Sequence, residues 1–525
     1  MARFGFCGGT YTLQSENIDA EEAINLYCEQ PESPGAKTSI ALLHTPGLAI
    51  AYTLGHEEAH QKLTPEPSVP ALFEVNGRAF AAATQFYELL AAPAINVPHL
   101  NWIARGLLNG PPLSPTQIIC NQTHLLILSN GALFIFVLTP FTDANNVLHP
   151  ANSFLAVDMS QFNGPVLQIG FLDGYFIAVI QNSNTFQVSA LEDGTSWSGL
   201  FISTISYFPD NITSMVCDHR EIWFYSGKRT VVYYNAGAGY PPFIPIQGAY
   251  IESGSGATFA TVQANNTVAW IEADERGGGR ALLAAGYVGQ RISTYAVEFA
   301  WQGYGDISNA VGYTYQDQGH IFWVIRFPSA NVTWVYDFAS SLWHKRLFFQ
   351  NGQYTAHRST SHCYVFGKHL VGDWASGNIY EMSIDLLDDF GNPIRWLRRS
   401  PTISKENAWI YFSRIEFDLE VGLGPQPPLL DGDGQPRAPQ VMLRWSNDAA
   451  KTWSNEYILN CGQAGDYDAR VYKTQLGRGR KRVWELSGTD PVPIRIADAY
   501  LEATCEGEPI YKGSERISEQ MRKVT

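Results

Sequence analysis

Charged residues are scarce in this chain. Asp, Glu, Lys and Arg make up 16% of its 525 residues, against about a quarter in an ordinary globular domain. An exposed surface with so few charges must be built largely from Asn, Gln, Ser, Thr and Gly, whereas exposed helices normally carry Glu and Lys. Aromatic residues reach 13% and hydrophobic residues 45%, which excludes a mostly disordered chain. The composition indicates a rigid, β-rich protein.

Long apolar runs, a secretory signal and closely paired cysteines are also missing. The longest uniformly apolar run covers residues 132–138, far short of the ~20 residues that a membrane-spanning helix needs. The first residues contain no apolar stretch of the kind that a signal peptide requires. The seven cysteines are scattered and form no C-x-x-C pair. We therefore expect reduced, mostly buried thiols, synthesis in a cytoplasm and no stable membrane insertion.

The net charge of −15 argues against a protein that grips nucleic acid over its whole surface, because such binding depends on Lys and Arg neutralising phosphates. An acidic chain remains compatible with a smooth, repulsive channel around DNA.

A hairpin unit recurs from about residue 70 to residue 393. It consists of a short apolar strand, a turn of Gly, Asn, Asp or Ser, and a second strand rich in aromatic and β-branched residues. The units cover residues 73–80; 124–136; 174–180 with 185–188; 221–225 with 229–234; 267–271 with 280–284; 320–325 with 331–336; and 363–366 with 378–380. Their spacing of roughly 43 to 53 residues is the period of a four-stranded propeller blade.

The turns within these units favour tight hairpins. Asn76-Gly77, Asn130-Gly131 and Ser226-Gly227 supply residues that accept a positive φ. Radial stacking of blades buries both faces of each sheet. The sequence therefore predicts an all-β fold with a β-propeller over residues 70–393, of six blades if the first and last hairpins share one blade and of seven if they do not. A large β-sandwich with irregular hairpins is the alternative.

Three further segments flank the predicted propeller. Residues 394–512 contain longer alternating runs, which predict a C-terminal antiparallel β-sandwich domain interrupted by a Gly-, Pro- and Asp-rich loop at 422–439. Residues 1–69 contain several prolines and few strand runs, so an extended N-terminal arm and docking segment is expected there. Residues 513–525 form a polar tail that we expect to be flexible.

Two motifs suggest chemistry at first sight. Residues 56–60 read His-Glu-Glu-Ala-His, a formal zinc-protease pattern, but Gly55 and two following prolines leave it without an apolar helix, which favours an exposed polar turn. A second motif resembles the Asp-box turn of sialidases, in which an Asp side chain accepts from backbone N–H groups; it comprises Ser446, Asp448, Thr452 and Trp453.

The Asp-box turn is structural even in glycosidases, and residues 189–197 look like a looser version of it in a blade turn. No phosphate-binding loop, nucleophile elbow or dinucleotide fingerprint is present. We therefore expect no enzyme activity, no cofactor and no metal.

Two basic clusters stand out from the rest of the chain. The denser one comprises Arg478, Arg480, Lys481 and Arg482, and the other comprises Arg395, Arg398 and Arg399. Such clusters can contact DNA phosphates or an acidic partner. A solvated strand face with balancing carboxylates is an equally good interpretation.

Short motifs at both ends of the chain carry a family resemblance. Asn25-Leu26-Tyr27-Cys-Glu29 precedes Thr45-Pro46-Gly47-Leu48, and residues 444–454, 477–484 and 493–495 supply a closing set of hairpin and basic strands. In these motifs the chain resembles the tail nozzle, or packaged-DNA stabilisation, proteins of short-tailed bacteriophages. Cys28 replaces the commoner proline, and the loop at 422–439 looks like an insertion.

The resemblance implies a structural virion protein in a phage tail, made in the host bacterial cytoplasm. It implies a homohexameric ring below the portal-adaptor ring that continues the DNA channel, retains packaged double-stranded DNA and docks fibres, spikes or a needle. The motif residues that become candidates for docking are Asn25, Leu26, Tyr27, Glu29, Pro46 and Gly47. The competing hypothesis is a propeller that binds or cleaves host surface glycans, suggested by the Asp-box turn and the aromatic content.

Overall fold

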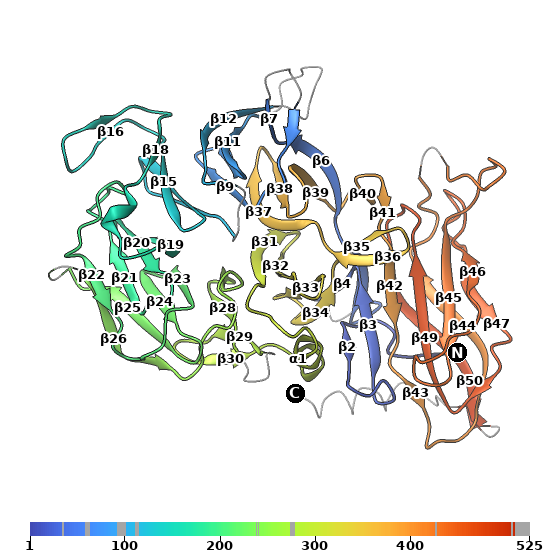
Figure 1. Cartoon of the computed structure of the whole chain (residues 1–525). Helices are drawn as coiled ribbons and strands as arrows, with labels where there is room; N and C mark the ends of the chain where they lie inside the picture. Colours follow the sequence, from blue (N-terminus) through green and yellow to red (C-terminus); the bar gives the residue numbers. More distant parts are fainter. Residues whose placement is uncertain are drawn as a thin grey trace.

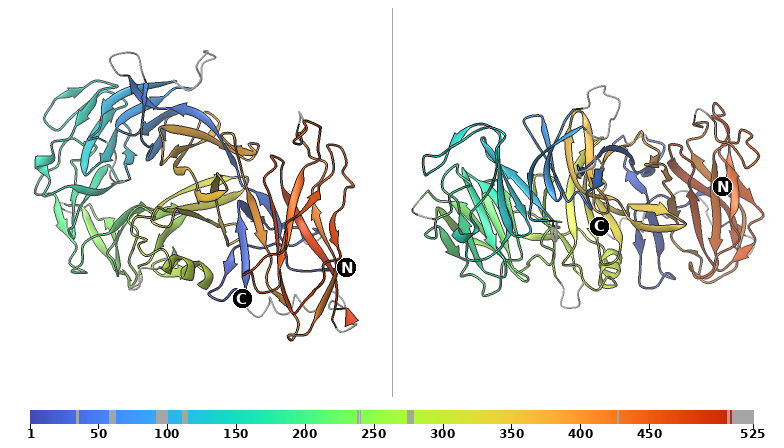
Figure 2. Two further views of the ribbon diagram at one scale, coloured as in Figure 1. Left: turned by 45° about the vertical axis from the view of Figure 1, so that its right-hand side comes forward. Right: turned by 45° about the horizontal axis from the view of Figure 1, so that its top comes forward.

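A computed structural model describes the chain except residues 34–35, 58–62, 92–100, 111–114, 238, 240, 274–278, 426–427, 506–507 and 510–525. The described residues form a β-propeller beside a β-sandwich, with N-terminal strands lying between the two domains (Figures 1 and 2).

Six propeller blades each have four strands arranged in sequence order. Blades 1 and 2 comprise β9 (Ala71–Val75), β10 (Arg78–Ala82), β11 (Gln85–Leu89), β12 (Trp102–Leu107), β13 (Gln117–Cys120), β14 (His124–Ser129), β15 (Ala132–Val137) and β18 (Phe154–Ala156). Blades 3 and 4 comprise β19 (Val166–Leu172), β20 (Tyr175–Ile180), β21 (Thr185–Val188), β22 (Ile202–Thr204), β23 (Ser214–Asp218), β24 (Glu221–Tyr225), β25 (Thr230–Asn235) and β26 (Phe243–Ile251). Blades 5 and 6 comprise β27 (Val262–Ala264), β28 (Thr267–Ile271), β29 (Ala281–Ala284), β30 (Gly289–Arg291), β31 (Val311–Asp317), β32 (His320–Phe327), β33 (Val332–Asp337) and β34 (Leu342–Lys345).

A seventh, composite blade closes the ring. Its strands β37 (Ser359–Val365), β38 (Lys368–Asp373) and β39 (Asn378–Ser383) are completed by β6 (Gly47–Thr53), which pairs antiparallel with β39. The first strand of this blade, β37, contacts β9 of blade 1. The propeller prediction is thus confirmed, and the last blade takes its outer strand from the N-terminal segment.

Strand β14 shows why the blades stack. All six of its residues are buried. Leu125 and Ile127 pack toward blade 1, whereas Leu126 and Leu128 pack toward blade 3. Alternate side chains of a strand point to opposite faces, so a continuous apolar run is what a sheet covered on both sides requires.

The predicted hairpins are present, but two details of the prediction are wrong. Asn76-Gly77 and Asn130-Gly131 adopt positive φ angles as expected, whereas Gly227 does not. The turn at Ser226 is held instead by its hydroxyl, which accepts from the Arg229 N–H at 3.0 Å. In blade 7 the predicted pairing of residues 363–366 with 378–380 is wrong, because β38 lies between them.

The C-terminal sandwich consists of two sheets to which the N-terminal segment contributes strands. One sheet has the order β4 (Leu26–Glu29), β5 (Ala41–His44), β50 (Arg495–Cys505), β44 (Ile410–Leu419) and β47 (Val471–Thr474), with β1 (Ala2–Arg3), β48 (Arg478–Gly479) and β51 (Glu508–Pro509) at its margins. The other has the order β3 (Ala20–Ile24), β42 (Trp396–Arg399), β49 (Lys481–Gly488), β45 (Gln440–Ser446) and β46 (Tyr457–Asn460), with β2 (Tyr11–Thr12) and β43 (Ile403–Ser404).

The second sandwich sheet continues into the propeller. Strand β3 pairs antiparallel with β42 and makes a parallel bridge to β34 of blade 6, at Ile24 and Lys345. Figure 1 shows β3 between the propeller strands and β42. The two domains therefore share one hydrogen-bonded sheet.

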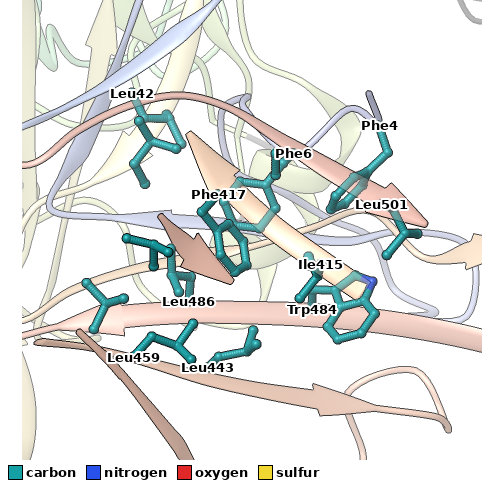
Figure 3. Close-up of a cluster of buried hydrophobic side chains, with 14 of the residues drawn as sticks. Phe4, Phe6, Leu42, Ile415, Phe417, Leu443, Leu459, Trp484, Leu486 and Leu501 are labelled. Atoms are coloured by element: carbon teal, nitrogen blue, oxygen red, sulfur yellow. The ribbon is translucent and has the colours of Figure 1, made fainter. Parts of the chain in front are cut away.

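The core of the sandwich also depends on the N-terminal segment. Phe4, Phe6 and Leu42 pack among apolar side chains of the C-terminal strands (Figure 3). The Phe6 ring lies 5.2 Å from the ring of Phe417 in an edge-on arrangement. The N-terminal segment, which the sequence predicts to be an extended arm, forms extended strands. These strands are built into both domains, because their alternating apolar side chains complete the cores of the propeller and the sandwich.

Shorter elements complete the described part of the chain. They are β7 (Gly55–Glu57), β8 (Leu63–Pro65), β16 (Phe141–Thr142), β17 (Leu148–His149), β35 (Leu347–Gln350), β36 (Gln353–Ala356), β40 (Asp388–Asp389), β41 (Asn392–Pro393), the 3-10 turn η2 (Met159–Gln161) and helix α1 (Tyr295–Gln302). The predicted tail at 513–525 lies outside the described residues.

Candidate functional site

The family motif around Asn25 lies at the junction between the two domains. Asn25 is buried and adopts a φ of 54°. Its amide nitrogen donates to the carbonyl oxygens of Leu347 (2.9 Å) and Arg395 (2.8 Å), and its side-chain oxygen accepts from the Leu347 N–H (2.8 Å). Asn tolerates the left-handed conformation better than most residues. One side chain thus ties the N-terminal segment to the propeller and to the strand that begins the sandwich.

Leu26 and Tyr27 face opposite domains. Leu26 is fully buried in the sandwich core, whereas Tyr27 packs in the propeller core, with its ring 5.6 Å from that of Phe322. This division follows from the alternation of side chains along a strand. The motif therefore joins the two cores through neighbouring residues.

Glu29 completes a charged triad with the propeller. It contacts His320 Nε2 at 2.7 Å, and His320 Nδ1 lies 2.9 Å from Asp337. The hydrogen bond to Asp337 and the one to Glu29 raise the pKa of His320 to about 9 against the opposing effect of burial. Burial acts to raise the pKa of Asp337, but hydrogen bonds from His320 and Ser340 lower it overall. The imidazolium form therefore fastens β4 to blade 6 at neutral pH.

The second half of the motif is the turn that precedes β6. Pro46 and Gly47 are buried, and the Thr45 N–H donates to the carbonyl oxygen of Asn25 at 3.3 Å. A Cβ on Gly47 would lie 2.5 Å from the carbonyl oxygen of Leu386, so the close approach of two backbone segments requires glycine here.

Five of the six motif residues proposed for docking are therefore buried within the chain, and the sixth, Glu29, keeps a side chain that is 42% exposed. The buried five are Asn25, Leu26, Tyr27, Pro46 and Gly47, and burial leaves them unavailable to another protein in this state. What the motif positions is the junction between the propeller and the sandwich.

Arg398 and Arg399, in the second basic cluster, also belong to the junction. Arg398 is fully buried; it donates to the carbonyl oxygens of Phe6 (2.6 Å) and Gly9 (2.8 Å) and pairs with Glu21. Arg399 lies 3.0 Å from Glu22 and 2.8 Å from Glu485. Sequence reasoning offered these arginines for DNA or an acidic partner. Their carboxylate and carbonyl partners show that they hold the N-terminal segment against the sandwich.

The denser basic cluster divides into exposed and buried members. Arg478 and Arg480 are exposed and lie over the Trp409 ring at 4.5 and 4.9 Å. Lys481 is partly exposed and bonds Asn17. Arg482 is buried among aromatic rings and donates to the Leu476 carbonyl at 2.7 Å, and burial lowers its pKa to about 9. The exposed pair at the end of the sandwich is the part of this cluster that a partner can reach.

The Asp-box-like turn forms as a structural device. Asp448 Oδ1 accepts from the Ser446 hydroxyl (2.6 Å) and from the backbone N–H of Thr452 (2.8 Å), and these and neighbouring bonds hold the pKa of Asp448 well below its usual range. Two guanidinium groups lie over the Trp453 ring, that of Arg444 at 4.6 Å and that of Arg399 at 5.1 Å from the ring centre. An Asp engaged in this way is a turn residue rather than a catalytic acid.

The looser Asp-box-like turn at residues 189–197, in blade 3, is held by the same kinds of bond. Asp193 accepts from the Thr195 N–H at 2.8 Å, and the buried Trp197 donates to the Gly194 carbonyl at 2.7 Å.

The remaining motifs give no catalytic or metal site. In the His-Glu-Glu-Ala-His segment, residues 55–57 form strand β7 rather than a helix, and residues 58–60 lie outside the described part. The described residues hold no group of three or more His, Cys, Asp or Glu placed to bind a metal ion. All seven cysteines are free, four of them buried. Within the same residues no helix is long and apolar enough to cross a membrane.

Asp389 is a junction residue that the sequence did not reveal. It is buried beside the start of β6, and its Oδ1 has no hydrogen-bond partner within the described residues. Burial and the neighbouring Asp388 raise its pKa to about 8, although Arg346 and Arg358 act in the opposite direction.

This raised pKa predicts a stability that depends on pH. The protonated carboxyl contributes its full stability below the unfolded pKa of about 4 and loses it as the pH rises to about 8. We expect Asp389→Asn to raise the free energy of unfolding at pH 8.5 by at least about 1 kcal/mol relative to its effect at pH 4, since one pKa unit corresponds to about 1.4 kcal/mol. Urea unfolding at both pH values measures this. Asp385→Asn, at an exposed residue nearby in the chain, is the control, and an equal effect of Asp389→Asn at both pH values would contradict the assignment.

These features define a two-domain propeller–sandwich protein in which the N-terminal motif locks the domains together. The family model described as the bacteriophage P22 Gp10 β-propeller matches residues 83–386, and the one described as the bacteriophage P22 Gp10 β-sandwich matches residues 395–504. The chain belongs to this family of tail nozzle and DNA-stabilisation proteins of short-tailed phages. It is a structural protein of a phage tail, and membership of this family points to a non-enzymatic role.

Several solved structures are distantly similar to this chain. YCF48 from Cyanidioschyzon merolae has a TM-score of 0.38 and 10% identity, over 61% of this chain and 96% of its own. The extracellular domain of the putative hybrid two-component system BT4673 from B. thetaiotaomicron has a TM-score of 0.38 and 10% identity, over 90% and 59%. The WD40 domain of Toxoplasma gondii coronin has a TM-score of 0.35 and 10% identity, over 70% and 87%. The search of curated proteins gave no match.

Proposed function

We propose that six copies of this chain form a ring below the portal-adaptor ring of a short-tailed phage. In that position the ring continues the DNA channel, retains packaged DNA and docks fibres, spikes or a needle. The observation that carries this proposal is the match of both family models, in order, to the propeller and the sandwich.

The shared sheet suits a wall that bears pressure. Blade 6, β3 and the sandwich strands form one hydrogen-bonded sheet. A network of ion pairs crosses the same junction, in which the Glu22 carboxylate lies 2.8 Å from Lys345 and 3.0 Å from Arg399. Domains joined in this way resist relative motion better than domains joined by a flexible linker.

The charge distribution suits a channel through which DNA slides. Residues 1–393 carry 16 Lys and Arg against 32 Asp and Glu, whereas residues 394–525 carry 19 against 18. Carboxylates repel phosphates, so an acidic wall does not hold the duplex. We expect residues that face the lumen of the ring to be enriched in Asp and Glu, and a basic lumen would overturn this part of the proposal.

Electron microscopy of the purified chain, alone and mixed with the matching portal-adaptor ring, tests the assembly. We expect rings of six at the distal face of the adaptor.

The double variant Arg478→Glu/Arg480→Glu tests whether the exposed basic pair contributes a contact, and we expect it to reduce ring formation at least tenfold. Lys451→Glu, at another exposed site of the sandwich, is the control. A chain that stays free of the adaptor would contradict the proposal.

A further inference from the structure

A surface groove lies at one end of blade 4, where blade 5 fails to cover it. Strand β26 of blade 4 is nine residues long, whereas β27 and β30 of blade 5 have three residues each. The face of blade 4 that packs against blade 5 therefore continues past the end of its neighbour. The groove there has a volume of about 530 Å³. Neither the Asp-box turns nor the domain junction lies in it.

The floor of the groove is a row of side chains across three strands. Glu221 on β24 lies directly opposite Tyr234 on β25, and Tyr234 lies opposite Ile244 on β26. Residues opposite each other in an antiparallel pair present their side chains on the same face. Tyr234 is 39% exposed and Ile244 40%, so the row offers an aromatic ring and an aliphatic side chain beside a carboxylate.

The polar groups around this floor are already held in place by the protein. Tyr287 of blade 5 donates from its hydroxyl to Glu221 Oε1 at 2.5 Å. The Arg220 guanidinium makes two bonds of 3.0 Å to Asp173, and the His219 ring lies 2.7 Å from Asp218. A ligand would therefore meet donors and acceptors whose orientation is fixed before binding.

The turn that carries two of these groups is strained. His219 and Arg220 have φ angles of 46° and 63°, in a two-residue hairpin of the kind that normally uses Asn-Gly. Side chains larger than glycine are costly in this conformation. Strain of this kind at a surface turn is consistent with residues kept for their side chains rather than for the turn.

We propose that this groove binds a saccharide chain of the bacterial surface. A pyranose ring has an apolar C–H face that fits an aromatic ring and a rim of hydroxyl groups that bond to carboxylate, amide and guanidinium groups. The groove combines these groups, with Gln247 supplying an amide, and neither sign of charge dominates it. That balance favours a hydroxyl-rich ligand over a polyanion such as nucleic acid. This binding goes beyond the structural role of the chain in the tail.

A glycan array tests the proposal with the purified chain. The probes are oligosaccharides from bacterial O-chains and capsules, and we expect a defined subset to bind. Tyr234→Ala and Glu221→Gln should each lower the affinity for that subset at least tenfold, because the first removes the ring at the centre of the floor and the second removes the charge and one acceptor oxygen of the carboxylate beside it. Tyr472→Ala is the matched control, since Tyr472 is 45% exposed on the sandwich, and it should leave binding unchanged.

Three outcomes would overturn the proposal. The array could bind no glycan, Tyr234→Ala and Glu221→Gln could both leave binding unaltered, or the groove could bind a peptide of a tail-fibre or spike protein in place of every sugar. Ring formation on the portal adaptor is measured separately with the same variants. Since these substitutions lie outside the junction and the basic pair, ring formation should not change, which distinguishes failure of this proposal from failure of the assembly proposal.

Discussion

Asn25→Ala is expected to lower the free energy of unfolding by about 3 kcal/mol or more. The substitution leaves the carbonyl oxygens of Leu347 and Arg395 and the N–H of Leu347 without the partner that Asn25 supplies, and each buried polar group left unpaired costs about 1–3 kcal/mol. It also places alanine at a φ of 54°, which adds about 1 kcal/mol.

Urea unfolding gives the loss of stability, and amide exchange at Leu347 gives its location. Exchange is the more specific measurement, because a two-domain chain need not unfold in one step. We expect Leu347 to exchange faster in the variant while amides in blades 2 and 3 keep their protection.

Asn76→Ala is the matched control for Asn25→Ala. Asn76 has nearly the same φ, 53°, but lies in an exposed hairpin turn. It shares the conformational cost and lacks the buried hydrogen bonds, so its loss of stability should be about 1 kcal/mol. If the two variants lose the same stability, the junction does not depend on the Asn25 side chain.

Gly47→Ala is expected to separate the start of β6 from the segment that leads into β40. The added Cβ would lie 2.5 Å from the carbonyl oxygen of Leu386 and 2.6 Å from that of Asp388. Both atoms belong to the backbone of the segment that leads into β40, which lies on the side of β6 opposite β39, so relief of the clash requires β6 and this segment to separate. Overpacking of this kind costs about 1–3 kcal/mol, and here the cost falls at the start of the strand that completes blade 7.

Hydrogen exchange along β6 and β40 measures this separation. We expect faster exchange on both strands in Gly47→Ala, together with a lower urea midpoint. Gly227→Ala is the control, because a Cβ at Gly227 meets no atom within 4 Å and its φ is not positive. Unchanged exchange on β6 in Gly47→Ala would show that the start of β6 accommodates the methyl group.

The local parts of the fold were predictable from the sequence. The hairpins at Asn76-Gly77 and Asn130-Gly131 and the strands of the sandwich around β44 and β49 depend on side-chain alternation and on two-residue turns. The turn at Asp448 was predictable for the same reason, since its bonds join residues at most four positions apart. The family resemblance located the motif at Asn25–Glu29 and suggested that it docks other proteins. In the structure most of its side chains contact other parts of the same chain.

Local sequence patterns and short motifs thus predicted the repeated hairpins, the sandwich strands, the Asp turns and the family. Tertiary structure decided that β6 closes blade 7, that Asn25 bonds partners 322 and 370 residues away, and that Arg398 is buried against Phe6 and Gly9. It also decided that blade 5 leaves the row of Glu221, Tyr234 and Ile244 partly exposed. Turns and alternation follow from neighbours in the chain, whereas these contacts exist only after the ring has closed and distant strands have come together.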